Sequence, residues 1–452
     1  MSERRAPLAR QRFKPYPAYK DSGVEWLGEI PAHWEVKRLK FVAARNPAAS
    51  KVRGLAPDTE VSFVPMEAVG EYGGLDLSRT KPLADVGSGY TYFRDGDVVV
   101  AKITPCFENG KGAHATGLVN GIAFGTTELH VLRATQALDD QFLFYLTLSE
   151  AFRRLGEAEM YGAGGQKRVP ESFIENLRHP LPSISEQRGI AAFLDRETAR
   201  IDALVAKKER LIELFQEESS ALITRTVTKG LDPNVPMKDS GVEWLGEIPA
   251  HWKVKRLRHI GKAIIGLTYE PSDVVNQDEG VLVLRASNVS DGHIVLEDNV
   301  FVKSAIPERL LTKVGDILIC SRSGSRALIG KNAKIDKTSA GLTFGTFMTV
   351  FRSVCNEYLF YAFNSTLFNY QSGAFLTSTI NQLTVENLKG FTVPIPPRDE
   401  RSAIANFLVR ETVRIDSLVA KVHDAIDRLK ELRTALISAA VTGKIDVREE
   451  VA

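Results

Sequence analysis

One segment of the chain occurs twice, and this repeat constrains the fold more than any other feature. Lys20–Lys40 reads KDSGVEWLGEIPAHWEVKRLK, and Lys238–Arg258 is identical to it at 19 of 21 positions. A second pair, Ser185–Lys207 and Asp399–Lys421, is identical at 15 of 23 positions. Because both pairs keep the same order along the chain, we expect a tandem duplication that folds as two similar halves.

Shorter matches between these segments keep the same order. They pair Gly96-Asp97-Val98-Val99 with Gly315-Asp316-Ile317-Leu318, Phe124-Gly125-Thr126 with Phe344-Gly345-Thr346, Phe144-Tyr145 with Phe360-Tyr361, and Glu175-Asn176-Leu177 with Glu386-Asn387-Leu388. A chain of 452 residues is also long enough for two or more domains. We therefore expect an N-terminal tail (1–19), a first globular domain (20–182), a first long helix (183–230), a second globular domain (231–396), a second long helix (397–446) and a C-terminal tail (447–452).

The two globular regions have the pattern of mixed α+β structure. Apolar runs bounded by Gly and Asp predict strands, and they lie at Asp97–Ile103, Glu128–Arg133, Val281–Ala286 and Asp316–Ser321. Helices are expected at about Asp139–Leu155 and Asn356–Tyr370, with Asp139 and Asn356 as their N-caps.

The segments after the globular regions have the spacing of long amphipathic helices. In the second copy, apolar residues at steps of three and four predict a coiled-coil seam of Ile415, Leu418, Val422, Ala425, Leu429, Leu432 and Leu436. The matching residues of the first copy, two of them charged, are Ile201, Leu204, Lys208, Leu211, Phe215, Glu218 and Leu222. A second apolar row flanks both seams: Val205, Ile212, Val419 and Ile426.

Each of these segments could be an ordinary buried helix of about 30 residues, roughly 45 Å long. Two matched helices in one duplicated chain can, however, bury their seams on each other. The expected fold is therefore two α+β globular domains in tandem repeat, joined by two long antiparallel coiled-coil helices, with pseudo-two-fold symmetry.

The sequence contains no recognised catalytic or metal-binding motif. There is no phosphate-binding GxxxxGK[ST] loop, no GxSxG and no HExxH, and the eight histidines are scattered. The three cysteines, Cys106, Cys320 and Cys355, lack CxxC spacing and are expected to be free thiols in a reducing cytoplasm. No apolar run is long enough to span a membrane, and the basic N-terminus lacks the apolar core of a secretory signal. These features favour a cytoplasmic binding protein.

The repeated segments resemble a known family. GVEWLGEIPAHWEVKRL, PLPSISEQRGIAAFLDRETARIDALVAKKERLIELF and PIPPRDERSAIANFLVRETVRIDSLVAK are similar to segments of the specificity subunit of type I restriction–modification enzymes. The resemblance covers nearly the whole chain after about residue 15, in the order recognition domain, helix, recognition domain, helix. This chain departs from the pattern at Val409, where the first copy has Asp195, and at Thr228-Lys229-Gly230, which transposes Thr442-Gly443-Lys444.

The resemblance implies a chain with no catalytic activity or cofactor of its own. Each recognition domain would bind one half of a split double-stranded DNA target, and the helices would set the spacer length. Two methyltransferase subunits, which bind S-adenosylmethionine, would dock on the helices, and restriction subunits would join them. The residues alone leave two other functions open, a protein–protein scaffold and the recognition module of a single-chain modification enzyme.

DNA contacts are expected in polar loops that follow strands, because bases and phosphates are bound by Arg, Lys, Asn, Gln, Ser and Thr side chains. The net charge of +2 indicates that such a surface must come from local clusters. The predicted contacts are Lys102, Thr104, Asn109, Lys111, Gln166, Lys167, Arg168, Ser321, Arg322, Ser323, Ser325, Arg326, Lys331, Thr379, Asn381 and Gln382. Each of these residues could equally be a solvated loop residue.

The repeated 21-residue segment has another expected role. Two different half-targets would not be read by identical residues, so this segment should do the same task in both halves. We expect Trp26, Trp34, Trp244 and Trp252 to anchor each globular domain to the helices. The exposed charges between them would then contact partner subunits.

Overall fold

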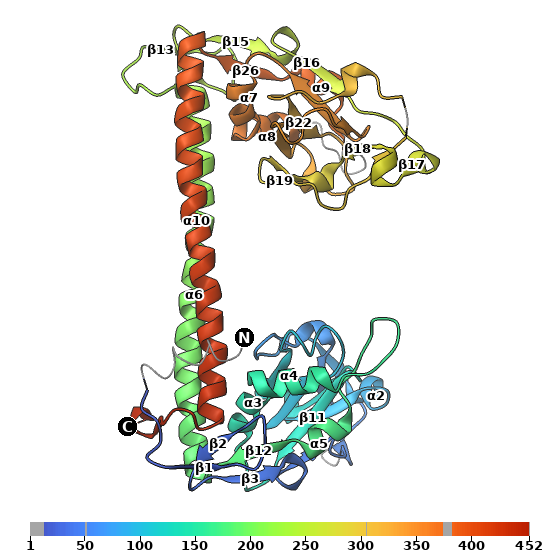
Figure 1. The fold of residues 1–452 in the computed structure, drawn as a ribbon, viewed down its shortest axis with the longest axis vertical. Coiled ribbons are helices and arrows are strands. Elements are labelled where there is room, and N and C mark those ends of the chain that lie inside the picture. Colours follow the sequence, from blue (N-terminus) through green and yellow to red (C-terminus); the bar gives the residue numbers. More distant parts are fainter. Residues whose placement is uncertain (1–12, 50–51, 304, 374–381, 452) are drawn as a thin grey trace. The chain divides into compact units, whose positions relative to one another are not determined.

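The computed structural model describes residues 13–49, 52–303, 305–373 and 382–451. The chain divides into two compact units. The first contains Met1–Lys208 and His423–Ala452, and the second contains Glu209–Val422. Two long helices, α6 (Ile184–Lys229) and α10 (Arg398–Val441), each run from one unit into the other (Figure 1). Two mixed domains joined by long helices are therefore confirmed.

The globular part of the first unit is built mainly from two four-stranded sheets, ordered β6-β5-β10-β7 and β4-β11-β8-β9, with helices packed beside them (Figure 1). Its strands are β1 (Tyr19–Asp21), β2 (Glu29–Pro31), β3 (Glu35–Arg38), β4 (Ala43–Arg45), β5 (Glu60–Val64), β6 (Thr80–Pro82), β7 (Thr91–Arg94), β8 (Asp97–Ala101), β9 (Gly112–His114), β10 (Ile122–Gly125), β11 (Leu129–Ala134) and β12 (Arg178–Leu181). Its short helices are α2 (Leu83–Val86), α3 (Asp140–Leu148), α4 (Glu150–Ala158) and α5 (Glu171–Asn176).

The globular part of the second unit repeats this plan, with sheets ordered β16-β25-β22-β23 and β17-β21-β18-β24. Its strands are β13 (Met237–Asp239), β14 (Glu247–Pro249), β15 (Lys253–Arg256), β16 (Lys262–Ile265), β17 (Val274–Val275), β18 (Val281–Leu284), β19 (Val289–Ser290), β20 (His293–Ile294), β21 (Phe301–Val302), β22 (Ile317–Cys320), β23 (Asn332–Lys334), β24 (Thr343–Phe344), β25 (Met348–Arg352) and β26 (Thr392–Ile395). Its short helices are α7 (Asn356–Phe363), α8 (Thr366–Gly373) and α9 (Val385–Gly390).

All four predicted strands form, as β8, β11, β18 and β22, because their apolar runs are buried in the sheets. In each unit one buried ion pair joins the two central strands of a sheet. The guanidinium group of Arg133 donates to both carboxylate oxygens of Asp97 at 2.6 and 2.7 Å. Arg352 does the same to Asp316 at 2.8 and 2.6 Å. The matched pairs show that both domains fold around the same internal contact.

The predicted short helices are each split in two. Ser149 has an extended backbone between α3 and α4, and its side chain accepts a hydrogen bond from the Phe152 amide, which caps α4. Asp139 caps α3 as predicted. The prediction for Asn356 is wrong: Cys355 occupies the N-cap of α7. The side-chain Nδ2 of Asn356 instead donates to the carbonyl oxygens of Gly315 and Phe351, both at 2.8 Å.

Two of the short sequence matches lie in a different register in the fold. Leu129 and Met348 pair with the last residues of β8 and β22, so Phe344 corresponds to Gly125 and not to Phe124. The amide of Leu39 donates to the Leu177 carbonyl, and the amide of Leu257 donates to the Phe391 carbonyl. The match of Glu175-Asn176-Leu177 is therefore displaced by three residues, onto Lys389-Gly390-Phe391. Short identical strings recur by chance, whereas backbone pairing fixes the true equivalence.

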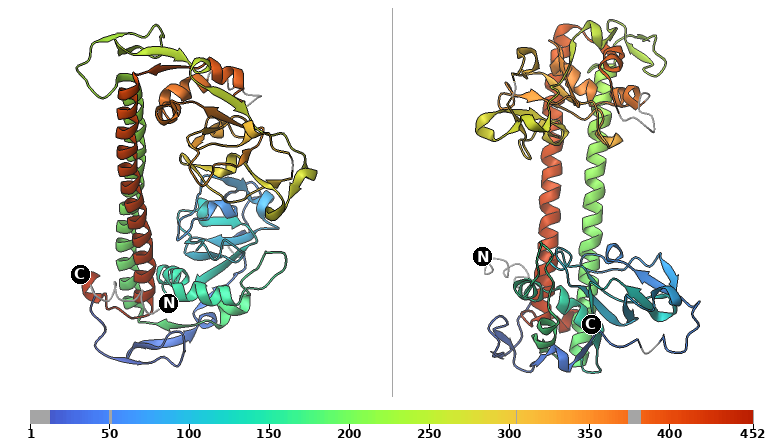
Figure 2. Two further views of the ribbon diagram at one scale, coloured as in Figure 1. Left: turned by 45° about the horizontal axis from the view of Figure 1, so that its top comes forward. Right: turned by 90° about the vertical axis from the view of Figure 1, so that its right-hand side faces the viewer.

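In each unit a stretch of α6 lies beside an antiparallel stretch of α10 (Figure 2). The helices contain 46 and 44 residues and lie within the predicted ranges 183–230 and 397–446, so they are longer than the seam estimate of about 30 residues. The row of α6 that is turned inward also differs from the predicted seam. Leu204 and Leu211 are 40% and 37% exposed, whereas Ile212 is 8% exposed. The less exposed row consists of Ile201, Val205, Lys208, Ile212, Phe215, Ser219 and Leu222. Both rows have the same three–four spacing, so the spacing alone does not determine which row is buried in the folded protein.

The tryptophans of the repeat fasten each domain to a helix end. Trp34 and Trp252 are fully buried. Trp34 shares a hydrophobic cluster with Ile437 of α10, and Trp252 shares one with Val227 of α6. Trp26 and Trp244 are half-buried against the same clusters. The predicted anchoring role is confirmed, and each copy of the repeat packs against the helix that ends in its own unit.

The transposed Lys and Gly residues make equivalent contacts in the two units. The ammonium group of Lys444 donates to the carbonyl oxygen of Glu29, and that of Lys229 donates to the matching carbonyl of Glu247. Gly443 and Gly230 both have positive φ, +71° and +78°, just after α10 and α6. A Cβ atom at these glycines would meet the ring of Trp34 at 3.0 Å and that of Trp252 at 3.3 Å. The two helices end at different distances from the glycine, and the Lys and Gly residues therefore keep equivalent contacts although their order is reversed.

Candidate nucleic-acid interface

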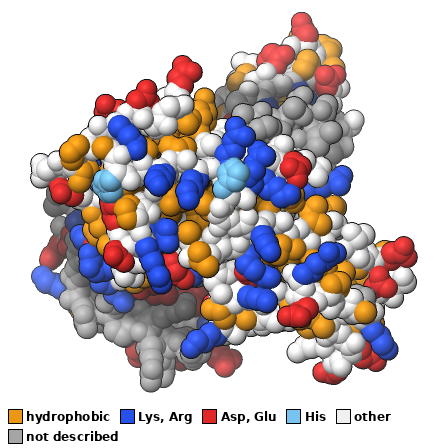
Figure 3. Space-filling view, turned by 90° about the horizontal axis from the view of Figure 1, so that it is seen from above, with side chains coloured by type: hydrophobic (Ala, Val, Ile, Leu, Met, Phe, Trp, Pro, Cys, Tyr) orange, Lys and Arg blue, Asp and Glu red, His pale blue; other side chains and the backbone are white. Residues whose placement is uncertain are grey.

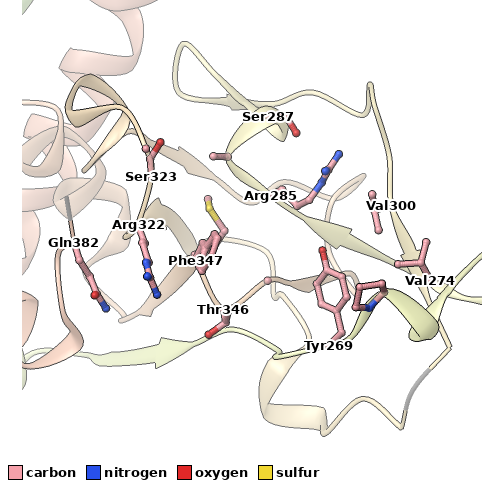
Figure 4. Close-up of a pocket in the computed structure, with 15 residues that line it drawn as sticks. Tyr269, Val274, Arg285, Ser287, Val300, Arg322, Ser323, Thr346, Phe347 and Gln382 are labelled. Carbon is pink, nitrogen blue, oxygen red and sulfur yellow. The ribbon is translucent and has the colours of Figure 1, made fainter. Parts of the chain in front are cut away.

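A cavity with a volume of about 1190 Å³ lies in the second unit (Figure 4). It opens where the chain leaves β18, β22 and β24, so its walls are loop residues held by the ends of buried strands. Aromatic, basic, amide and hydroxyl side chains face it, among them Tyr269, Arg285, Ser287, Arg322, Ser323, Thr346, Phe347 and Gln382. This combination of flat apolar rings and hydrogen-bonding groups suits a nucleobase.

Arg322 lies on one wall of this cavity, beside Gln382 (Figure 4). Its guanidinium group lies 5.1 Å from the centre of the Phe347 ring, at a distance typical of a cation–π contact. The backbone amide of Arg322 donates to the Phe347 carbonyl, and an isolated β-bridge joins Arg322 to Gln382. The backbone therefore holds these three residues together, while the Arg322 side chain remains exposed.

Arg285 lies on the opposite wall and is held by an acid. Its Nη2 donates to Asp298 Oδ2 at 2.8 Å, so part of its charge is already compensated. Tyr269 lines the same side (Figure 4). Arg285, Tyr269 and Phe347 are not among the contacts predicted from the sequence. A Gly two residues before an aromatic residue, as in Gly345-Thr346-Phe347 after a strand, was the available signal.

Several predicted contacts of the second unit are placed differently. Ser321 is buried, and its hydroxyl donates to Thr349 Oγ1 at 2.6 Å, which gives it a packing role. Ser325 and Arg326 are exposed, whereas Ser323 and Lys331 are partly buried. Thr379 and Asn381 lie outside the described residues. Of the predicted group, Arg322, Ser323 and Gln382 are brought together at the cavity.

In the first unit the predicted residues lie on two neighbouring loops. The amide of Thr104 donates to the Lys167 carbonyl at 3.0 Å, which joins the loop after β8 to the loop before α5. Lys102, Thr104, Lys111 and Arg168 are partly buried, and Asn109, Gln166 and Lys167 are exposed. The Lys111 ammonium group donates to the Met66 carbonyl at 3.2 Å.

Arg168 forms a two-pronged ion pair. Its Nε and Nη2 donate to the two carboxylate oxygens of Glu128 at 2.9 and 2.8 Å. The hydrogen bond from Arg168 lowers the pKa of Glu128 below its usual value, so the carboxylate is charged at neutral pH. Arg168 is among the DNA contacts predicted from the sequence, and Glu128 is not.

A second cavity, of about 610 Å³, lies in the first unit between the globular part and the helices. Arg433 of α10 crosses it: its Nη2 donates to the Tyr72 carbonyl at 3.1 Å, and its Nη1 lies 3.5 Å from Asp202 Oδ1. Ser219 takes the place of Arg433 in the repeat. These contacts tie the domain to the helix, which gives this cavity a structural explanation.

On the face shown in Figure 3, Lys and Arg side chains form several separate groups among hydrophobic and uncharged ones. Within the described ranges, no three His, Cys, Asp or Glu side chains form a group that could hold a metal ion. No helix in the part of the chain that the structure describes is long and apolar enough to cross a membrane.

Comparison with known proteins shows similarity to one sequence family and to several relatives. Residues 249–417 match the sequence family described as the type I restriction modification DNA specificity domain. The EcoAI specificity subunit of Escherichia coli is 38% identical over 225 residues, which are 48% of this chain and 37% of that protein. The EcoEI specificity subunit of the same species is 36% identical over 212 residues, 46% of this chain and 35% of that protein. The match thus spans just over a third of the length of these relatives.

Other relatives cover nearly the whole chain at lower identity. A Methanocaldococcus jannaschii protein described as the MjaX specificity subunit is 23% identical over 93% of this chain and 96% of its own length. A chain from a structure of type I R-M complex assembly and conformational transition has a TM-score of 0.71, at 18% identity, and covers 91% of this chain and 98% of its own. The HsdS subunit of Thermoanaerobacter tengcongensis has a TM-score of 0.51, at 20% identity, over 92% and 98% of the two chains.

The two structural likenesses show a shared fold, and the sequence matches show the relationship. Together they confirm the resemblance inferred from the repeated segments. Residues 249–417 of this chain are thus similar to the type I restriction modification DNA specificity domain, and the chain as a whole is similar to the specificity subunits of type I restriction enzymes.

Proposed function

We propose that this chain recognises DNA for a type I restriction–modification enzyme, and that each unit binds one half of a split target. One observation carries the proposal. Both units have the same fold and the same internal ion pair, yet the side chains at their strand-end loops differ. Two readers of different half-sequences require a shared scaffold with different side chains at the reading position.

The side chains at these loops suit the two kinds of DNA contact. Arg322 and Gln382 have the donor and acceptor groups that read base edges in the major groove. Exposed basic residues of the loops, Arg326 in the second unit and Lys167 in the first, suit phosphate oxygens. Buried Ser321 supports the loop from within. The side chains in the cavity and those exposed in the loops are therefore both of the types that contact DNA.

The remaining parts of the proposal concern the assembly. The chain itself is proposed to be non-catalytic and without a cofactor, in the cytoplasm. Two methyltransferase subunits, which use S-adenosylmethionine, would dock on α6, α10 and the exposed charges of the repeated segment, and restriction subunits would join them. The repeated segment is identical at 19 of 21 positions in the two units, which supports two copies of one partner.

The test is a genome-wide map of N6-methyladenine in the host with and without this gene. We expect one bipartite motif, two short sequences separated by a fixed spacer, to lose methylation on deletion and to regain it when the gene is supplied in trans. The control is the same deletion complemented with a chain that lacks 249–417. If no motif changes, DNA reading is refuted and the scaffold function gains support.

A further inference from the structure

Two backbone contacts show that the two units place different side chains at the same points of the fold. In the first unit the amide of Lys102 donates to the Glu128 carbonyl at 2.9 Å. In the second unit the amide of Ser321 donates to the Phe347 carbonyl, also at 2.9 Å. Glu128 and Phe347 each immediately precede the strand that carries the buried arginine of the ion pair. Glu128 and Phe347 are therefore equivalent.

A second pair of contacts adds two more equivalent positions. An isolated β-bridge joins Ile103 to Arg168 in the first unit, and another joins Arg322 to Gln382 in the second. The three matched positions, here called the reading triad, hold Ile103, Glu128 and Arg168 in the first unit and Arg322, Phe347 and Gln382 in the second. The backbone is the same at these positions, and none of the three side chains is.

The first triad is neutral overall and presents a carboxylate. Arg168 donates two hydrogen bonds to Glu128, one to each oxygen. A carboxylate has about four acceptor sites, so Glu128 keeps acceptor capacity while Arg168 fixes its orientation. The Glu128 side chain is 25% exposed and can be reached by a ligand. This triad is built to accept hydrogen bonds.

The second triad carries one positive charge and presents a donor. It contains no acid, and within the described part of the chain Arg322 forms no ion pair. Phe347, 52% exposed, has its ring centre 5.1 Å from the guanidinium carbon, and a cation–π contact of this kind leaves the N–H groups of Arg322 for a ligand. Gln382 adds an amide beside it. This triad is built to donate hydrogen bonds to a pair of acceptors.

We propose that the reading triad sets one base of each half-target, an inference that rests on the proposed DNA recognition. Arg322 donates to O6 and N7 of a guanine in one half-target, because guanine alone presents two adjacent acceptors in the major groove. Glu128 accepts from N4 of a cytosine in the other half-target. A phosphate contact would not require the three side chains to differ between the units, whereas base reading does.

The experiment uses the full chain with its methyltransferase subunit, in a host that lacks the native gene. For Arg322→Ala we expect methylation of the wild-type motif to fall about 10- to 100-fold, with loss of a guanine preference at one position of one half-target. The other half-target stays unchanged. Arg309→Ala is the matched control, because Arg309 is an exposed arginine of the same unit outside the cavity lining.

Transfer of the triad tests the inference independently. The triple variant Ile103→Arg, Glu128→Phe and Arg168→Gln should introduce a guanine preference at one position of the half-target read by the first unit. Circular dichroism and thermal unfolding verify that each variant is folded. A uniform loss of methylation at all sequences with Arg322→Ala indicates a phosphate contact and overturns base reading. An unchanged motif in both variants also overturns it. A wild-type chain that produces no bipartite motif overturns DNA recognition itself.

Discussion

At the residue scale, the two units show which side chains the fold requires and which it leaves free. The Asp97–Arg133 and Asp316–Arg352 pairs are the same in both units because each carboxylate is buried and must be compensated. Asp195 is different: it accepts hydrogen bonds from Tyr145 and Gln141 at 2.7 Å in the first unit, and Val409 replaces it in the second. The buried aspartates are therefore the same in both units, whereas the more exposed Asp195 could be replaced.

His179 in β12 gives the first unit a pH-dependent stability. Its side chain is fully buried, and burial lowers its pKa to about 4, below the value of about 6.5 in an unfolded chain. As the pH falls from about 6.5 towards 4, His179 becomes protonated in the unfolded chain but stays neutral in the folded chain. The free energy of unfolding therefore decreases as the pH falls. By pH 4.5 this loss should be about 2.5 kcal/mol.

Val393 occupies the equivalent position in β26, so His179→Val is a substitution that the fold already contains. We expect this variant to remove the His179 contribution while it keeps the fold. Urea unfolding of both proteins at pH 7.5 and 4.5 measures the difference. Parallel pH dependences in the variant and the wild type would contradict the assignment.

At the scale of elements, the long helices show how packing selects one face among several. Both α6 rows have apolar residues at three–four spacing, but Val205 and Ile212 are turned inward more than Leu204 and Leu211. The matching Ile426 of α10 is also buried. Lys208 lies in the inward row, where the aliphatic part of a lysine can pack while its charge stays in water.

Neighbouring alanine substitutions distinguish the two rows. Ile212→Ala should lower the free energy of unfolding by about 2–4 kcal/mol, because it leaves a cavity in the packed row. Leu211→Ala should change it by less than about 1 kcal/mol, since the side chain is exposed and Ala favours the helix. Urea titrations followed by circular dichroism give both values. A larger loss for Leu211→Ala would restore the seam expected from the sequence.

At the scale of the whole molecule, both ends of the chain contribute to one unit. The Asp446 amide donates to the Lys14 carbonyl at 2.8 Å, and the Tyr19 hydroxyl donates to the Gly443 carbonyl at 3.1 Å. The end of α10 also supplies Leu436, Ile437 and Val441 to the hydrophobic cluster around Trp34. The first unit is therefore assembled from segments about 400 residues apart, a separation that makes its formation slow compared with local elements.

Removal of residues 436–452 should unfold the first unit selectively. The deletion takes several buried apolar side chains from its core, each worth about 1.5–3 kcal/mol, which together exceed the stability of an ordinary domain. Hydrogen exchange should lose protection in β8 and β11 but keep it in β22 and β25. Equal protection in the truncated and intact chains would show that the terminal segment is dispensable.

Much of the fold was predictable because it depends on local pattern. The duplication, the strands at Asp97–Ala101 and Ile317–Cys320 and the two long helices follow from repeats and from spacing along a few turns. The burial of Trp34 and Trp252 was also predictable, because large aromatic residues in a repeated segment favour the core. In the candidate site, Arg322 and Gln382 were identified by residue type and loop position alone.

The sequence by itself determined that two like domains alternate with two long helices. Only the tertiary structure decided which helix row is buried, which helix end each Trp packs against, and that Glu128 neutralises Arg168 from 40 residues away. The physical reason is the distance along the sequence over which each interaction acts. Periodicity and propensity act between neighbouring residues, whereas side-chain pairing depends on segments that meet only after the chain has folded.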